Sequence, residues 1–455
     1  MNVRRTDEAA SVEITRALAE FAHRLTFADL DDDMVVVARH CILDWLGVTI
    51  AAVDEDVVTA ARAQVIEDGG DGQATVLATN YMVAAAQAAL VNGVAGHALD
   101  YDDVLRPLRG HPTAPVLPAV LALAEKTGAS GQDLLSAFTG GIEVAARVGA
   151  LLGDSHYESG WHSTATVGTF GAAAGCAALL GLDKARCGHA LGLAGIQAAG
   201  LKAGFGTMAK PYQVGKAAAN GLVAAQMAAR DVTSRPDILE CAQGVGATQT
   251  SVFDAAAIDG LGTSWLARDV LFKHHAACYG THAPIEAAIR IRSSDAFASG
   301  SIDRVVVNVG TRCLGNCNII GPRTGLQGKF SLRFTTALAL LGEDTAAIGT
   351  YCEEMVTRPD IVDLMGRTEV HGRESLDRNV AELSAQLADG IVVTETFDVG
   401  KPDPDLDYQE RKLGAKFRSL SEPVIGTEKT SALLDAVANL ETLSDIRDLT
   451  ALARA

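Results

Sequence analysis

Aromatic residues are scarce in this sequence: Phe, Trp and Tyr make up 5% of its 455 residues. The hydrophobic share of 48% must therefore come mainly from Ala, Leu and Val, and together with Gly these small side chains let helices pack closely. A chain of this length exceeds the usual size of one hydrophobic core, so we expect two domains.

Positive charge is also in short supply. The chain has 38 Lys and Arg against 56 Asp and Glu, a formal net charge of -18. A field of that sign repels nucleic acids and anionic membrane surfaces, so we expect neither as a partner. A small anionic substrate would need basic residues gathered locally, which makes every basic cluster informative.

Signals for export, membrane insertion and metal binding are missing as well. Met1 to Leu18 contains no continuous apolar stretch, so we expect no secretory signal and a cytoplasmic protein. The uncharged runs Gly72 to Leu99 and Ser159 to Leu182 contain polar residues and favour buried helices over membrane spans. The eight cysteines include no CxxC, and the one close pair, Cys313 and Cys317, lacks further ligands at zinc spacing.

Apolar residues recur at helical spacing from Asp7 to about Arg268, and Ser130 before Asp133 predicts a helix start. Gly140 next to Gly141 predicts close packing of that helix. The helices that we expect here and near the C-terminus are Pro118 to Lys126, Asp133 to Gly149, Thr164 to Leu180, Gly215 to Arg230, Tyr408 to Leu420 and Thr430 to Leu440.

The pattern changes after about residue 268. Ile302 to Val309 and Ile391 to Val399 are β-branched runs that predict strands, with a helical stretch, Leu332 to Leu341, between them. Lys401 to Pro404 reads as a rigid connector. We therefore predict a mainly α fold, with a large all-helical domain of residues 1–267 and 405–455 and a smaller α/β lid domain of residues 268–404.

The acidic run Asp100, Asp102 and Asp103 places three carboxylates within four residues. Such a cluster is stable when exposed, when paired with cations, or when one member holds a proton. A solvated helix end is the plain alternative. A DxDD motif also occurs in class II terpene cyclases, but those enzymes need an aromatic-lined cavity to stabilise carbocations, and this chain has few aromatics.

Basic and hydroxyl residues follow in three segments. His111 lies in RPLRGHP, and His162 in GWHSTATVGTFG precedes a helix whose free N–H groups could bind a carboxylate. Simple N-capping by Ser163 or Thr164 and a structural His111 are the alternatives. Lys210 lies in KAGFGTMAKP, a GxG fragment without the preceding strand of a dinucleotide site, and Pro211 predicts an extended or turn geometry at Lys210.

A fifth segment, KHHAACYGTHAP, combines one Lys, three His and one Cys. The adjacent His274 and His275 point in different directions in a helix or a strand, so we predict no metal site there. Six of the eleven His fall in these five segments, together with five Lys and Arg. In so acidic a chain, that concentration predicts the binding of a small polyanion.

Taken in order, NGVAGHALDYDD, RGHPTAPVLPAV, GWHSTATVGTFGAAAGCAALLGL, GFGTMAKP and KFSL resemble the MmgE/PrpD family, from about Thr15 to about Leu420. That family includes 2-methylcitrate dehydratase, cis-aconitate decarboxylase and iminodisuccinate epimerase. The resemblance implies a large helical domain and a smaller α/β lid, a homodimer, and an active site between the domains. It also implies a small di- or tricarboxylate substrate and neither a metal nor an organic cofactor.

Motif by motif, the resemblance implies five catalytic residues. Asp100 matches the first Asp of HALDxDD, His111 the His of the HP motif, and His162 that of GxH. Lys210 matches the Lys of GTMxK, and Lys273 opens the segment at the domain junction. The residues expected to bind substrate are Arg109, Lys202, His275, Cys278, Tyr279 and His282.

Three positions depart from the decarboxylase pattern. Val104 stands where the decarboxylase has Thr, Cys278 where it has His, and Phe334 where many members have Tyr. RGHP, GWH and the Cys-Tyr pair before His282 look closer to the epimerase. We therefore expect a cofactor-independent lyase that dehydrates or decarboxylates a 2-methylcitrate- or cis-aconitate-like substrate. The alternatives are an epimerase of an iminodisuccinate-like dicarboxylate and a catalytically inactive binding protein.

Overall fold

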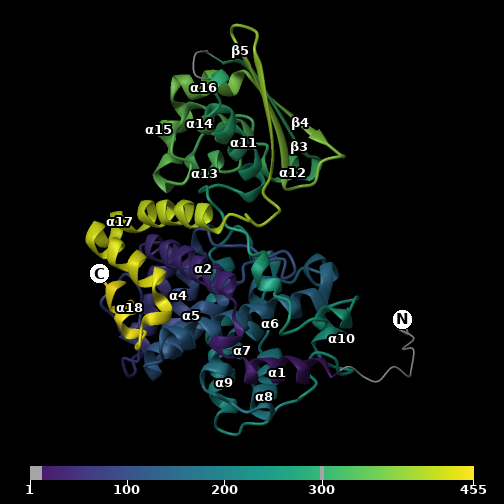
Figure 1. Cartoon of the computed structure of the whole chain (residues 1–455), viewed down its shortest axis with the longest axis vertical. Helices are drawn as coiled ribbons and strands as arrows, with labels where there is room; N and C mark the ends of the chain where they lie inside the picture. The colour runs from purple at the N-terminus through teal and green to yellow at the C-terminus, as the bar shows by residue number, and fades with distance from the viewer. Residues whose placement is uncertain (1–12, 298–301) are drawn as a thin grey trace. The chain divides into compact units, whose positions relative to one another are not determined.

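The computed structural model describes residues 13–297 and 302–455, apart from the side chain of residue 316 (Figure 1). The helical pattern expected to start at Asp7 begins outside these residues. The chain divides into two units, the first formed by residues up to 270 and from 421 onward, and the second by residues 271–420. The second unit extends past residue 404 because helix α17 (Leu406–Ala438) begins within it.

The first unit is built almost entirely of helices. A short antiparallel hairpin, β1 (Ala74–Thr75) and β2 (Met82–Val83), lies among them. Besides the end of α17, the helices of this unit are α1 (Ile14–Arg24), α2 (Asp32–Ala51), α3 (Asp56–Asp68), α4 (Ala85–Ala98), α5 (Thr113–Thr127), α6 (Gly131–Glu158), α7 (Ser163–Leu179), α8 (Lys184–Gly195), α9 (Ala209–Ala228), α10 (Val245–Gln249) and α18 (Arg447–Leu452).

The small residues let the central helices touch backbone to backbone. A Cβ added to Gly141 of α6 would lie 2.8 Å from the carbonyl oxygen of Gly171 of α7, and one added to Gly171 would lie 2.6 Å from that of Gly141. The close packing predicted from the glycine pair is thereby confirmed. The predicted helix start is confirmed too, because the Ser130 hydroxyl accepts a hydrogen bond from the N–H of Asp133 at 3.2 Å.

Among the described residues, two helices are long and apolar enough to cross a membrane by length and composition: Asp32–Ala51 and Gly131–Glu158. Their apolar windows are 83% and 89% buried inside the protein. Core helices of globular proteins pass the same test, so the pattern does not by itself indicate a membrane span.

The second unit contains a four-stranded sheet in the order β4-β3-β5-β6. Strand β3 pairs parallel with β4 and antiparallel with β5, and β5 pairs antiparallel with β6. Helix α11 packs against β5, β6 and α14. The bounds are α11 (His282–Arg292), β3 (Ile302–Gly310), α12 (Thr311–Cys317), α13 (Gly325–Gly328), α14 (Leu332–Leu341), α15 (Glu353–Thr357), α16 (Pro359–Gly366), β4 (Thr368–Arg373), β5 (Val380–Leu387) and β6 (Val392–Asp398).

The two strands predicted from β-branched runs are β3 and β6, whereas β4 and β5 were not predicted. Strand β5 alternates buried and half-buried residues, as a strand with one covered face does, but its sequence VAELSAQL contains few strand-favouring side chains. The fold is mainly α, with a large helical domain and a smaller α/β domain.

Candidate active site

The loop between α4 and α5 holds the acidic run. Helix α4 ends at Ala98, and Asp100 then adopts a left-handed backbone conformation with φ of 51° that turns the chain. The Asp100 side chain keeps 49% of its surface exposed. Asp102 and Asp103, at 0% and 1%, are buried. The loop therefore separates one solvent-accessible carboxylate from two enclosed ones.

Asp102 lies between two histidines. Its Oδ2 is 2.9 Å from Nδ1 of His97 and 3.1 Å from Nδ1 of His111. Burial alone would raise the pKa of this carboxyl, but the two imidazoles that face it, His111 first and then His97, outweigh it and hold the pKa well below its usual range. Asp102 is therefore a buried carboxylate ion that orients both imidazoles.

Its neighbour Asp103 is in the opposite state. Burial, with the nearby charge of Asp44, raises the pKa of Asp103 well above its usual range, and this favours the protonated carboxyl. Asp103 is fixed by Thr113 at the start of α5, with 2.5 Å between the Thr113 Oγ1 and an Asp103 oxygen. Two adjacent acidic residues thus differ in charge because Asp102 faces two imidazoles, whereas Asp103 faces the charge of Asp44.

The buried histidines His97 and His162 favour the neutral imidazole. Burial lowers the pKa of His97 to about 4 and that of His162 to about 2. Their ring centroids are 5.9 Å apart. Within the described part of the chain, Nε2 of His97 and Nδ1 of His162 have no hydrogen-bond partner. Such buried nitrogens are suited to receive a polar group of a ligand.

Lys210 supplies the positive charge next to this group. Its ammonium donates to Oδ1 of Asp100 at 2.7 Å and lies 5.5 Å from the centre of the Phe205 ring. The edge of Phe205 in turn contacts His162, with 4.9 Å between ring centroids. Oδ1 of Asp100 is also 3.6 Å from Nε2 of His111. Asp100 therefore lies between the Lys210 ammonium and the His111 imidazole.

The backbone conformation expected for Lys210 is wrong. Lys210 lies in the first turn of α9, which begins at Ala209, rather than in an extended or turn geometry. Pro211 is tolerated there because the first N–H groups of a helix have no intrahelical partner to lose. The helix start then fixes the direction of the Lys210 side chain.

Two expected substrate-binding cations are engaged elsewhere. The Arg109 guanidinium pairs with Asp154 and donates to the carbonyl of Pro107 at 3.0 Å. The Lys202 ammonium donates to the backbone carbonyl of Tyr157 at 3.0 Å and lies 3.8 Å from the centre of the Tyr157 ring. The structure therefore does not bring Arg109 or Lys202 into the group around His111.

The second unit contains the remaining predicted residues. Lys273 and His275 are both 3% exposed. Nδ1 of His275 is 2.8 Å from the Thr345 hydroxyl, and its Nε2 is 3.3 Å from Glu286. Burial would raise the pKa of Glu286, but His275 and then Lys412 outweigh it and lower the pKa. His275 thus belongs to an internal ion-pair network.

His282, Tyr279 and Cys278 adjoin this network. The ring of His282 is 5.0 Å from that of His275 and 5.1 Å from that of Tyr279. Its Nε2 is 3.2 Å from the carbonyl oxygen of Ala277, and burial lowers its pKa well below the usual value. The Tyr279 hydroxyl donates to the carbonyl of Val399. Cys278 accepts a hydrogen bond from the thiol of Cys317.

Four groups of the first unit could also ligate a cation. Ligand atoms of His97, Asp100, Asp102 and His111 all lie within 4.8 Å of one another. Mixed imidazole and carboxylate donors suit several divalent metals. In the geometry described here, the Lys210 ammonium already supplies a positive charge at Asp100, and the two histidines face the same carboxylate. A side chain of the protein therefore already pairs with one of the two carboxylates of this group.

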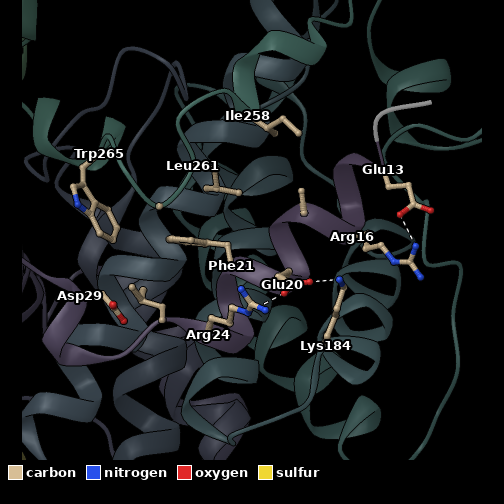
Figure 2. A pocket seen from close by; sticks show the side chains of 13 residues that line it. Glu13, Arg16, Glu20, Phe21, Arg24, Asp29, Lys184, Ile258, Leu261 and Trp265 are labelled. Carbon is tan, nitrogen blue, oxygen red and sulfur yellow. Dashed lines mark hydrogen bonds and ion pairs between the residues drawn. The ribbon is translucent and has the colours of Figure 1, made fainter. Parts of the chain in front are cut away.

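A separate cavity of ≈ 530 Å³ opens beside α1, where Figure 2 shows its lining residues. The cations around it are matched by carboxylates: Arg16 pairs with Glu13, and both Lys184 and Arg24 pair with Glu20. The lining of this cavity contains no histidine or cysteine, whereas the group around His111 combines imidazoles with a buried carboxylate and an ammonium. The group around His111 is therefore the stronger candidate for chemistry.

The domains of one known protein family match most of the chain. Residues 16–256 match the MmgE/PrpD N-terminal domain, and residues 275–442 match the MmgE/PrpD C-terminal domain. The chain belongs to the MmgE/PrpD family. Together the two matched domains span nearly all the described residues.

Curated relatives of this MmgE/PrpD chain match it from end to end. It is 28% identical to the cis-aconitate decarboxylase of Homo sapiens over 458 residues, which covers 97% of this chain and 94% of the relative. It is 28% identical to that of Mus musculus over 461 residues, with 97% and 93% covered. It is 26% identical to that of Aspergillus terreus (strain NIH 2624 / FGSC A1156) over 485 residues, with 99% and 97% covered.

Sequence reasoning on this MmgE/PrpD chain missed three residues of the group. His97 and Asp102 lie in the quoted motif HALDYDD, but the sequence could not show which of its carboxylates is buried and charged. Phe205 lies in GFGTMAKP and was not singled out. Its signal was its place in the same short loop, five positions before Lys210, from which an aromatic ring can cover the ammonium.

Proposed function

We propose that this chain is a lyase that removes CO2 or water at a carbon next to a carboxylate of a small di- or tricarboxylate, with no metal or organic cofactor. The observation that carries the proposal is the position of His111. Nδ1 of His111 faces the buried carboxylate of Asp102, and its Nε2 faces the Asp100–Lys210 pair. The relatives named as cis-aconitate decarboxylases make cis-aconitate the first substrate to test.

Lys210 is the proposed anchor for a substrate carboxylate. Its partner Asp100 is half exposed, so an incoming carboxylate can replace it at the ammonium without breaking a buried contact. When CO2 or a proton leaves the substrate, the electron pair of the broken bond spreads onto a conjugated carboxylate. A positive charge fixed beside that carboxylate stabilises the dianion more than the substrate and so speeds the reaction.

His111 is the proposed proton carrier. The charge of Asp102 favours the tautomer with hydrogen on Nδ1 and leaves Nε2 to exchange a proton with the substrate carbon. His162, which burial keeps neutral, is positioned to donate or accept a hydrogen bond without adding a competing charge. Lys273 and the other residues of the second unit remain predictions from the family resemblance.

We also propose that the protein is a homodimer. Several large apolar side chains beside the Phe205 loop are exposed: Leu201 at 54%, Met208 at 55% and Tyr212 at 47%. Exposed apolar patches of this kind mark interaction surfaces. Light scattering on the eluting peak of a size-exclusion column would give the mass. A mass of one chain at micromolar concentration would contradict the proposal.

A second candidate function is epimerisation of an iminodisuccinate-like dicarboxylate. Two observations favour it: Val104 and Cys278 stand where the decarboxylase pattern has Thr and His. In the first unit, the imidazoles of His111 and His162 also both contact a third imidazole, that of His97. An epimerase needs one group to remove the proton and another to return it on the opposite face.

One experiment separates these functions. The purified protein, with EDTA present, is incubated in D2O with cis-aconitate, citrate, 2-methylcitrate or iminodisuccinate, and proton NMR follows each substrate. Loss of CO2 or water supports the lyase. Deuterium uptake with change of configuration supports the epimerase instead. If none of the substrates changes in the presence of EDTA, the cofactor-independent enzyme is contradicted and a binding protein is favoured.

A further inference from the structure

Two thiols of the second unit lie in contact. The Sγ of Cys317 is 3.2 Å from the Sγ of Cys278 and donates a hydrogen bond to it. All eight cysteines of the chain are thiols in the structure. At this distance the two sulfurs are in direct contact, with no atom between them.

The fold brings these residues together across a long stretch of chain. Cys278 precedes a short 3-10 helix, Tyr279–Thr281, which leads into α11, and Cys317 is the last residue of α12. The space between them depends on Gly280, because a Cβ added there would lie 2.9 Å from the Cys317 Sγ. The glycine thus leaves room for the sulfur to approach its partner.

The geometry requires little movement to form a bond. A disulfide has a sulfur–sulfur distance of about 2.05 Å, so the two sulfurs must approach by only about 1 Å. Both cysteines lie at the ends of short helical turns, where a side-chain rotation or a small backbone shift can supply that movement. Cys313, in the same helix, is directed elsewhere: its Sγ donates to the carbonyl of Arg378 at 3.0 Å.

We propose that Cys278 and Cys317 form an oxidative modification site, at which a thiol oxidant converts the two thiols into one disulfide. With a small-molecule disulfide as oxidant, the Cys278 sulfur attacks one of its sulfurs and releases a first small thiol. The Cys317 sulfur then attacks the Cys278 sulfur of the mixed disulfide and releases the second. The two thiol protons pass to the two released thiols, so atoms and electrons balance.

The surroundings assign the two sulfurs different parts. Cys278 is partly exposed and accepts the hydrogen bond from Cys317, which stabilises a thiolate on Cys278. Cys317 is 1% exposed. The hydrogen bond to Cys278, together with burial, raises the pKa of the Cys317 thiol. An oxidant therefore meets Cys278 first, and Cys317 resolves the intermediate.

The disulfide would shift a segment that contains other predicted site residues. Cys278 lies between Lys273 and His282, and the adjacent Tyr279 ring contacts His282. Pulling Cys278 towards α12 would displace these side chains, and small misplacements of substrate-contacting groups are costly to turnover. This consequence rests on the proposed function, whereas formation of the disulfide does not.

The test treats the whole protein with diamide, an azo compound that takes up the two thiol hydrogens as the disulfide forms. Remaining thiols are then alkylated, and peptides are mapped by mass spectrometry. We expect a Cys278–Cys317 linkage that dithiothreitol removes. We expect the same linkage in Cys313→Ser, a matched control from the same helix, and its loss in Cys317→Ser.

A linkage through Cys313, or the absence of any linked peptide in the wild type, would overturn the site. Turnover of the substrate is measured separately on the same samples. We expect diamide to lower turnover roughly tenfold or more in the wild type and in Cys313→Ser, with recovery in dithiothreitol, but not in Cys317→Ser. A linkage without loss of turnover would overturn the effect on the segment. If no substrate is turned over even by reduced protein, the proposed function fails while the peptide map still decides the site.

Discussion

The two histidine groups of this protein differ in how their polar atoms are used. In the first unit, buried nitrogens of His97 and His162 have no partner within the described residues, and the nearby Lys210 keeps 19% of its side chain exposed. In the second unit, His275 lies between Thr345 and Glu286. Nε2 of His275 and Nδ1 of His274 also lack a hydrogen-bond partner within the described residues, so the groups differ in their carboxylates instead: Asp100 is 49% exposed and Glu286 8%.

That difference has an energetic meaning. A buried polar group without a partner costs about 1–3 kcal/mol of stability, so a chain that keeps several in one place gains little for its fold from them. A buried carboxylate paired with a cation, such as Glu286 with Lys412, contributes to one fixed geometry, whereas the half-exposed Asp100 can exchange its partner. Substitutions in the first group should therefore change chemistry, and those in the second should change stability.

The largest effect is expected in the first group. His111→Gln and Lys210→Ala should each lower kcat by about a thousandfold, because one removes the proton carrier and the other the charge that stabilises the dianion. Both should keep the circular dichroism spectrum and the melting temperature near those of the wild type. Near-normal turnover in either purified variant would remove that residue from the catalytic group.

The next test compares two neighbouring carboxyls of equal burial. Asp102→Asn should lower kcat by about a hundredfold and shift the pH–rate profile, because the amide cannot hold the charge that orients His111 and His97. Asp103→Asn should leave both nearly unchanged, because the pKa of Asp103 is raised and an amide resembles a protonated carboxyl. Equal losses in the two variants would contradict the assignment of charge.

In the second group we expect loss of stability. Glu286→Gln should lower the free energy of unfolding by about 2 kcal/mol, because it removes the charge paired with Lys412 and His275. Urea denaturation at pH 7 measures this effect, and the kcat of the folded variant should change much less than in Asp102→Asn. A large kcat loss with unchanged stability would mean that the second group is also used for chemistry.

The histidines of the first group should make stability depend on pH. The pKa of His97 is about 4 in the folded protein, against about 6.5 unfolded, so unfolding takes up a proton between these values and stability falls as the pH drops through them. His97 alone should remove about 2 kcal/mol between pH 7 and pH 5. Urea curves at both pH values should show a smaller loss in His97→Asn, and an unchanged loss would contradict the assignment.

The smallest effect is expected at Arg109, which pairs with Asp154 instead of joining the group. Arg109→Gln should change kcat/KM by less than about threefold, because a partly exposed ion pair contributes little. Initial rates over a range of substrate concentrations measure this, with Lys210→Ala as the positive control. A tenfold rise in KM would contradict this prediction and show that Arg109 binds the substrate.

Sequence patterns predicted ranges largely within α5, α6, α7, α9, α14 and α17 and two of the four strands of the larger sheet, and they named the motifs that lie together around His111. They could not place Arg109, because its partner Asp154 is 45 positions away and no local pattern links them. Nor could they show which residue of the acidic run is ionised, since Asp102 and Asp103 differ only in their tertiary neighbours. Lys210 was misjudged because Pro211 permits a helix start as well as a turn.

The first unit is assembled from both sides of the second in the sequence, and this sets an order on its folding. The N–H of Gly131 donates to the carbonyl of Leu443 at 2.8 Å, the N–H of Ile446 to that of Ala129 at 2.8 Å, and the N–H of Ala78 to that of Ala453 at 2.8 Å. A ribosome releases these partners only after residues 271–420 have emerged. The early helices must therefore wait with an uncovered apolar side during synthesis, when they are most exposed to aggregation and to chaperone capture.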